Sequence, residues 1–264
     1  MSTTESVDDL VERYYAVVKL PHDPFAKAFL GRCRSRTIKV DGRFYKYFQS
    51  GSGPAVLLVH GLNTNLGSMV TLADDLLAQG YRVVLLDVPP HGETLGTAGD
   101  PAEIRSLLRA LYAQLTGLYA VVCHSLGGLW ALTAWQAGTP ARALVSVSAP
   151  VTTRFLVEKF AEMNGLDDDR SRELTGEIER RLGPAVWQEY SALEAARTLD
   201  VPGLVVHGTA DDYVPPDHAH RLHAHWRGST LELLEGAGHF DIMETPELRE
   251  TVGAYLRGLD ATGP

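Results

Sequence analysis

The chain has 264 residues, of which 45% are hydrophobic and 22% are charged, a composition typical of a globular domain with its own buried core. It contains no run of eighteen or more apolar residues, so no membrane span is predicted. The formal net charge of -9 creates a field that repels phosphate groups and argues against a nucleic-acid partner. The polar, acidic amino terminus differs from a secretory signal, and the expected location is cytoplasmic. Cys33 and Cys123 fit no metal-binding or disulfide pattern.

Residues 1–35 are predicted to form a helical extension. Apolar residues recur at helical spacing from Val7 to Val18, and Pro21 and Pro24 interrupt the pattern. We expect the apolar face of this helix to pack on the main domain, although a dimer contact or a wall of the active site would use the same face. The sequence is therefore compatible with a monomer or a homodimer.

A mostly parallel sheet is predicted for the core of the chain, residues 36–150 and 200–264. Two runs flank the turn signal Asp41-Gly42 and predict an antiparallel hairpin with strands at 36–40 and 44–48. Short apolar runs then alternate with amphipathic stretches, as strands covered by helices on both faces do. The predicted parallel strands are 55–59, 82–86, 119–123, 143–147, 203–206 and 230–234. The expected fold class is α/β, with about eight strands in one central sheet flanked by helices.

Residues 151–199 interrupt this alternation after the sixth strand. They contain three helical stretches, separated by Gly165 and by Gly183-Pro184, and no strand-like run. An insertion at this point lies over the carboxyl ends of the strands, so we expect a helical cap that determines specificity. Aromatic residues at helical spacing more often serve as ordinary packing, but those in the cap are candidates for substrate binding. The candidates are Phe155, Phe160, Trp187 and Tyr190.

The strongest chemical signal is a serine between a predicted strand and a predicted helix. The segment Cys123-His124-Ser125-Leu126-Gly127-Gly128 follows the apolar run 119–122 and begins a helical stretch. A serine at such a sharp turn presents its hydroxyl above the sheet, and small residues two positions away on either side let the strand and the helix approach closely. Cys123 occupies a position where this motif usually has glycine.

A serine hydroxyl needs a neighbouring base, and the base needs an orienting acid, before the serine becomes an effective nucleophile. The loop after the strand 203–206 carries Asp211, and the loop after the strand 230–234 carries His239. Because the carboxyl ends of parallel strands lie at one edge of a sheet, these side chains are expected to converge on the serine. Asp212 adjoins Asp211 and could in principle reach the same histidine.

The order Ser, Asp, His and the loops around it resemble the α/β-hydrolase family of esterases, lipases and thioesterases. The resemblance extends from Phe44 to the end of the chain. It includes Val59-His60-Gly61-Leu62 after the first parallel strand and the loop 87–94 after the next. Pro90 departs from the glycine that is usual in that loop.

The resemblance implies that Ser125 is the nucleophile and His239 the general base. The family's acid loop has a glycine, two residues, the acid, two residues and Val-Pro. The segment 208–215 has this spacing, with Asp211 in the position of the acid. Asp211 is therefore preferred to its neighbour.

The resemblance also implies an oxyanion hole formed by the backbone N–H groups of Leu62 and Leu126. The implied reaction is hydrolysis of an ester-like bond in a small, largely apolar molecule, through an acyl-enzyme. This chemistry needs no cofactor, and none is predicted. Thioester hydrolysis or chain release, and C–C bond hydrolysis, would use the same residues. A non-catalytic ligand receptor would use the same fold.

Histidines, a common type of metal ligand, recur between positions 218 and 225. On a helix, His218 and His225 share a face but lie two turns apart, whereas His220 and His223 face elsewhere. No metal site is therefore predicted.

Overall fold

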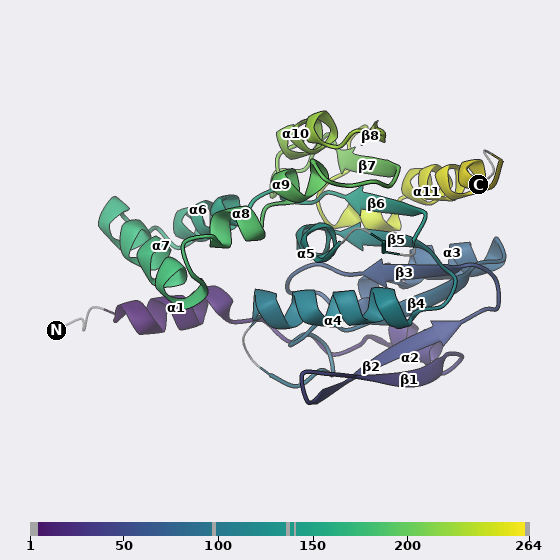
Figure 1. Cartoon of the computed structure of the whole chain (residues 1–264), viewed down its shortest axis with the longest axis horizontal. Coiled ribbons are helices and arrows are strands. Elements are labelled where there is room, and N and C mark those ends of the chain that lie inside the picture. Colours follow the sequence, from purple (N-terminus) through teal and green to yellow (C-terminus); the bar gives the residue numbers. More distant parts are fainter. Residues whose placement is uncertain (1–4, 97–98, 136–137, 140, 262–264) are drawn as a thin grey trace.

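Figure 1 shows a computed structural model of the chain, which describes residues 5–96, 99–135, 138–139 and 141–261. The first predicted range, 1–35, begins before the described residues, and the last, 200–264, extends beyond them. Eight strands form one sheet in the order β1-β2-β4-β3-β5-β6-β7-β8. The predicted α/β fold class is confirmed, and every predicted strand is present within two residues of its expected ends.

The sheet is antiparallel at one edge and parallel elsewhere. The hairpin of β1 (Arg34–Val40) and β2 (Arg43–Ser50) turns at Asp41 and Gly42, which have positive φ angles of 50° and 82°. Strand β2 pairs antiparallel with β4 (Arg82–Leu86), and β4 pairs parallel with β3. The remaining strands, all parallel, are β3 (Ala55–Val59), β5 (Leu118–His124), β6 (Ala143–Val147), β7 (Gly203–Gly208) and β8 (Ser229–Leu234).

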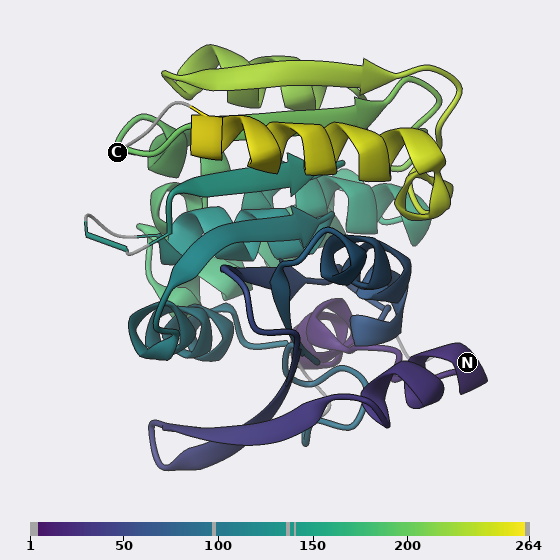
Figure 2. The ribbon, with the colours of Figure 1, turned by 90° about the vertical axis from the view of Figure 1, so that its right-hand side faces the viewer.

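Helices cover both faces of the sheet, and side chains of one strand alternate between two apolar clusters. In β3, Leu57 and Val59 face one cluster, whereas Val56 and Leu58 face the other. The first face packs against α4 (Pro101–Gln114), α5 (Leu126–Ala134) and α10 (Asp217–His225). Figure 2 shows the second face, which is covered by α3 (Val70–Ala78) and α11 (Pro246–Ala261). Helix α2 (Pro24–Leu30) adds side chains to the same apolar cluster. The short 3-10 helices are η1 (Leu66–Met69) and η2 (Asp241–Glu244).

The helical insertion follows the sixth strand, as predicted. Its two long helices end just before Gly165 and Gly183, which have positive φ angles of 61° and 89°. The third predicted stretch is divided in two at Tyr190 and Ser191, where Ser191 caps a new helix and forms a bridge with Thr152. The four helices are α6 (Thr153–Met163), α7 (Asp168–Leu182), α8 (Val186–Glu189) and α9 (Ala192–Ala196).

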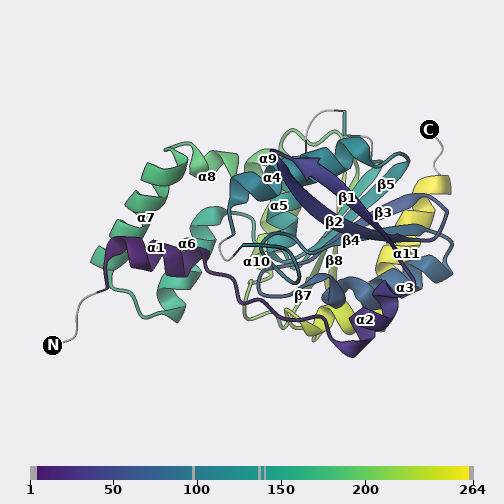
Figure 3. The ribbon, with the colours of Figure 1, turned by 90° about the horizontal axis from the view of Figure 1, so that it is seen from below.

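The amino-terminal helix α1 (Val7–Tyr15) packs on the insertion, not on the main domain as expected. Its fully buried Leu10 belongs to an apolar cluster with Leu174 and Ile178 of α7. Figure 3 shows α1 beside α6 and α7, at a distance from the sheet. The expectation was wrong because an apolar helical face does not specify which of several apolar surfaces it will cover.

A second amino-terminal helix, α2, was not predicted. Pro24 was interpreted as the end of helical structure, but it is the first residue of this helix, where proline is well tolerated. The Asp23 side chain caps the helix by accepting a hydrogen bond from the backbone N–H of Ala26.

The helix after Ser125 lies unusually close to the neighbouring strand. A Cβ atom added at Gly127 would stand 2.5 Å from the carbonyl oxygen of His60 and 2.7 Å from that of Val59. These atoms belong to the backbone and cannot rotate away. Gly127 therefore permits the approach of α5 to the end of β3.

Substitution of Gly127 by alanine is expected to lower the free energy of unfolding by about 1–3 kcal/mol, because the methyl group overpacks this contact. Gly176→Ala in α7 is a matched control, since a Cβ there would meet open space among the described residues. It should raise the free energy of unfolding by up to about 1 kcal/mol. Urea denaturation of both variants measures the difference. Equal changes in the free energy of unfolding for the two variants would contradict the close approach of α5 to β3.

Buried neutral histidines connect the loops at the carboxyl ends of the strands. Burial lowers the pKa of His60 to about 3, and its Nε2 accepts a hydrogen bond from the backbone N–H of Val88, at 2.9 Å. Burial likewise lowers the pKa of His218 to about 4, and its Nδ1 accepts from the N–H of Val151, at 3.1 Å. Each ring holds its loop only in the neutral form.

Acidification should therefore destabilise the protein. Because the ordinary pKa of 6.5 exceeds that of His218 in the folded chain, the unfolded chain binds more protons between about pH 6.5 and pH 4. This part of the stability is complete above pH 6.5 and is lost as the pH falls. His218→Asn retains an acceptor for Val151 but does not titrate. It should reduce the slope of unfolding free energy against pH by up to about 1.4 kcal/mol per unit. If urea denaturation gives the same slope against pH for the wild type and His218→Asn, His218 is not a source of the pH dependence.

Candidate active site

Ser125 occupies the sharp turn between β5 and α5. Its φ of 54° lies in the left-handed region that residues other than glycine rarely adopt. Its backbone N–H donates a hydrogen bond to the carbonyl of Val147 on the adjacent strand, at 2.8 Å. The turn thus directs the hydroxyl out of the sheet at the carboxyl end of β5.

The structure brings together the three residues of the predicted triad. The Oγ of Ser125 lies 2.8 Å from Nε2 of His239, and Nδ1 of His239 lies 2.8 Å from Oδ2 of Asp211. Because Nδ1 must donate to the carboxylate, Nε2 is left as the acceptor that faces the serine hydroxyl. The His239 carbonyl also accepts a hydrogen bond from Nε2 of His124, at 2.8 Å, which holds the loop against β5.

Asp211 is held as a carboxylate by several donors. Burial opposes its ionisation, but hydrogen bonds from His207, His239 and the backbone of Val214 outweigh that effect and hold the pKa of the carboxyl below its usual range. Its Oδ1 accepts from the N–H groups of Tyr213, at 3.0 Å, and Val214, at 2.8 Å. The rival acid Asp212 is exposed, whereas Asp211 makes the contact with the histidine ring.

His207 is a partner of the acid that sequence reasoning missed. Its ring is buried, and its Nε2 lies 3.2 Å from Oδ2 of Asp211 and 2.8 Å from the carbonyl of Val214. A proton on Nε2 can therefore serve both acceptors. The only sequence signal for this role was its position at the end of β7, directly before the acid loop.

The two residues predicted to supply the oxyanion hole flank the serine. Leu126 is the first residue of α5, and Leu62 lies in the loop after β3. That loop passes close to Ser125, since a Cβ added at Gly61 would stand 2.8 Å from the Cβ of Ser125. The next residue, Asn63, donates its backbone N–H to Nε2 of His91, at 3.1 Å. Oxyanion binding by the two leucine N–H groups stays a prediction.

A cavity of about 250 Å³ lies between the insertion, the amino-terminal segment and the loops around Ser125. Leu62 and Leu126 contribute to its wall. Three of the four aromatic residues proposed for substrate binding also line it: Phe155, Phe160 and Tyr190.

The structure does not place the fourth candidate, Trp187, at the cavity. Its indole N–H donates to Glu179 on α7, and the guanidinium of Arg154 lies over its ring at 4.6 Å. Residues 13–17 line the cavity, and the sequence had offered a wall of the active site as one alternative role for the apolar helical face from Val7 to Val18.

Within the described ranges, no cluster of three or more His, Cys, Asp or Glu side chains is arranged to hold a metal ion. Two histidines of α10 have separate partners: His223 contacts the Ser229 hydroxyl, and a ring nitrogen of His225 donates to the carbonyl of Arg221. Among the residues that the structure describes, no helix is both long enough and apolar enough to span a membrane.

The chain is similar in sequence to known hydrolases. The sequence profile of the alpha/beta hydrolase family matches residues 56–249. The chain is 25% identical to Esterase YbfF of Escherichia coli over 225 residues, which cover 73% of this chain and 88% of the esterase. It is 27% identical to a pimeloyl-[acyl-carrier protein] methyl ester esterase of Neisseria meningitidis over 232 residues, covering 73% and 89%.

The fold is also similar to that of a solved esterase, Pf2001 from Pyrococcus furiosus. The TM-score is 0.71, with 17% sequence identity, and the match covers 93% of this chain and 97% of that one. The family profile alone covers well over half of the chain. The protein therefore belongs to the alpha/beta hydrolase family.

Proposed function

We propose that the protein is a serine hydrolase that cleaves an ester-like bond in a small, largely apolar substrate through an acyl-enzyme. The observation that carries this proposal is the continuous chain of contacts from Ser125 through His239 to Asp211, each 2.8 Å long. The esterase relatives favour an ester as the substrate. The proposed partner is thus a small molecule. The cytoplasmic location stays a prediction from the sequence.

In the first half of the reaction, Nε2 of His239 accepts the hydroxyl proton as Oγ of Ser125 bonds to the substrate carbonyl carbon. The carbonyl oxygen becomes an oxyanion, to which the N–H groups of Leu62 and Leu126 donate hydrogen bonds in this proposal. Collapse of this intermediate breaks the bond to the leaving oxygen. His239 then returns the proton to that oxygen and leaves an acyl-serine.

In the second half, His239 accepts a proton from water as the water attacks the acyl carbon. The same histidine protonates Oγ as the acid product leaves, so the protein ends in its starting protonation state. Asp211 keeps the Nδ1 proton in place and stabilises the imidazolium formed in both halves. Its hydrogen-bonded, ionised state suits this role.

The central test is hydrolysis of p-nitrophenyl esters from acetyl to long acyl chains. Ser125→Ala should lower kcat by a factor on the order of 10⁴ to 10⁶, because it removes the atom that bonds to the acyl group. Ser146→Ala is the matched control, since Ser146 is a buried serine on the adjacent strand. It should retain activity.

Turnover that survives in folded Ser125→Ala would contradict the assigned nucleophile. If the wild type hydrolyses thioesters, or C–C bonds beside a carbonyl, in preference to esters, the triad stands and the proposed ester specificity falls. A wild type that turns over none of these substrates would favour the non-catalytic receptor.

The choice of acid can be tested separately. Asp211→Asn should lower kcat by a factor on the order of 10⁴, because an amide does not stabilise the imidazolium and favours the wrong tautomer. Asp212→Asn removes the neighbouring, exposed carboxylate and should leave kcat nearly unchanged. Circular dichroism confirms the fold of both variants. The reverse order of losses would assign the acid to Asp212.

A further inference from the structure

The amino-terminal segment and the two residues predicted to supply the oxyanion hole line one cavity. Residues 13–17 line the same cavity as Leu62 and Leu126, although they are far apart in the sequence. Resting on the proposed function, we infer that residues 13–17, held in place through residues 18–22, form a fixed wall that sets the length of an uncharged, straight-chain acyl group bound next to Ser125.

The inner part of this wall is aromatic and packs against the insertion. The ring of Tyr14 stands edge-on to Phe160 of α6, with ring centres 5.3 Å apart, and to Tyr15, at 4.9 Å. The guanidinium of Arg13 lies over the Phe160 ring at 5.3 Å and also bonds to Asn164. The end of α1 and the end of α6 therefore interlock, and together they close one side of the cavity.

The charges at the cavity are already paired with groups of the protein. Arg13 makes two hydrogen bonds to the carboxylate of Glu5, at 2.9 and 2.8 Å. Lys159 lies 3.2 Å from the carboxylate of Glu162. A charged acyl group would have to compete with these carboxylates. Most of the other lining side chains are apolar, so the cavity favours an uncharged hydrocarbon chain.

Hydrogen bonds attach the segment to the loop beside the nucleophile. The N–H of Val18 donates to the side-chain oxygen of Asn63, at 2.9 Å. Asn63 is the residue directly after Leu62. The side-chain amide of Asn65 donates to the carbonyl of Leu20, at 3.0 Å. The wall is thus connected to the loop that carries one predicted oxyanion donor.

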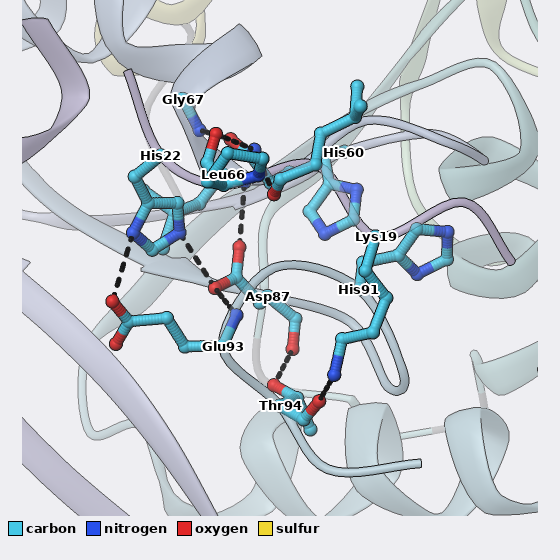
Figure 4. Close-up of polar contacts among 12 residues, drawn as sticks. Lys19, His22, His60, Leu66, Gly67, Asp87, His91, Glu93 and Thr94 are labelled. Carbon is cyan, nitrogen blue, oxygen red and sulfur yellow. Dashed lines mark hydrogen bonds and ion pairs between the residues drawn. The ribbon is translucent and has the colours of Figure 1, made fainter. Parts of the chain in front are cut away.

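A buried hydrogen bond between a histidine and an aspartate fixes the far end of the segment (Figure 4). Nε2 of His22 lies 2.8 Å from Oδ2 of Asp87, and His22 is only 3% exposed. The other oxygen of Asp87 accepts from the N–H of Leu66, at 2.9 Å, and Oδ2 also accepts from the N–H of Glu93, at 3.1 Å. Since α1 is held by the insertion and His22 by this loop, the residues between them have a defined position. A wall with a defined position imposes a limit on chain length.

Two substitutions with opposite effects test the wall. Tyr14→Ala removes a ring from it and should move the preferred p-nitrophenyl ester to longer chains. Val17→Phe adds a ring and should move the preference to shorter chains. The ratio of kcat/KM for long and short esters should change by about fourfold for each methylene group gained or lost.

The controls preserve the wall. Tyr14→Phe retains the ring, and Val18→Ala alters a side chain that is 58% exposed and outside the cavity lining. Both should keep the wild-type preference. A wild-type chain-length profile in folded Tyr14→Ala and Val17→Phe would overturn the inference while leaving the proposed hydrolase intact.

Binding separates failure of the wall from failure of the hydrolase. Straight-chain methyl ketones carry a carbonyl but no ester leaving group, so their affinity can be measured by calorimetry in the Ser125→Ala background. When Tyr14→Ala or Val17→Phe is added to the Ser125→Ala variant, the ketone chain length that binds best should shift as the preferred ester does. Those shifts without ester turnover in the wild type would support the wall and reject the hydrolase. Ketone affinity that does not depend on chain length would overturn the wall.

Discussion

The left-handed backbone of Ser125 is the constraint on which the proposed chemistry depends. Such a conformation costs on the order of 1–3 kcal/mol for a residue with a side chain, and it persists only where the surroundings impose it. Here β5 is paired on both sides, and the Ser125 N–H is bound to Val147. Gly127 brings α5 against the end of β3. Sheet and helix together therefore hold the hydroxyl in place before any substrate arrives.

The other two residues of the triad reach the serine because of the direction of the strands. Asp211 and His239 follow β7 and β8, whose carboxyl ends lie at the same sheet edge as that of β5. Their loops are short and are held by hydrogen bonds, including those from His124 and His207. Such preorganised groups need little rearrangement when charge develops on the histidine, which is the main way in which a fixed site lowers a reaction barrier.

The sequence predicted the sheet well because its parallel strands are buried on both faces. The runs 55–59 and 143–147 are entirely buried, so each appears as a short apolar block between polar segments. The convergence of Ser125 and His239 was also predictable, since it follows from strand direction. These features depend on local pattern and on general rules of topology, both of which a single sequence contains.

Contacts between distant surfaces were less predictable. The apolar face of α1 was recognised, but its partner on α7 was not, because many apolar surfaces can satisfy the same face. Trp187 is aromatic and lies in the insertion like Phe160, yet its indole N–H bonds to Glu179 and its ring lies beneath an arginine. Composition and helical spacing do not separate these two environments. Only the tertiary arrangement decides which aromatic ring borders a cavity.

The cavity and the triad depend on different parts of the chain, and this separation has a consequence for specificity. The triad is held by the sheet edge, whereas the cavity is built from the insertion, the amino-terminal segment and one loop beside Ser125. Asn63 connects the two systems, since it follows Leu62 and accepts a hydrogen bond from Val18. Changes in Tyr14 or Phe160 can therefore reshape the cavity without altering the contact between Ser125 and His239. Changes that displace Asn63 would affect both, because the same loop forms part of the cavity and approaches Ser125.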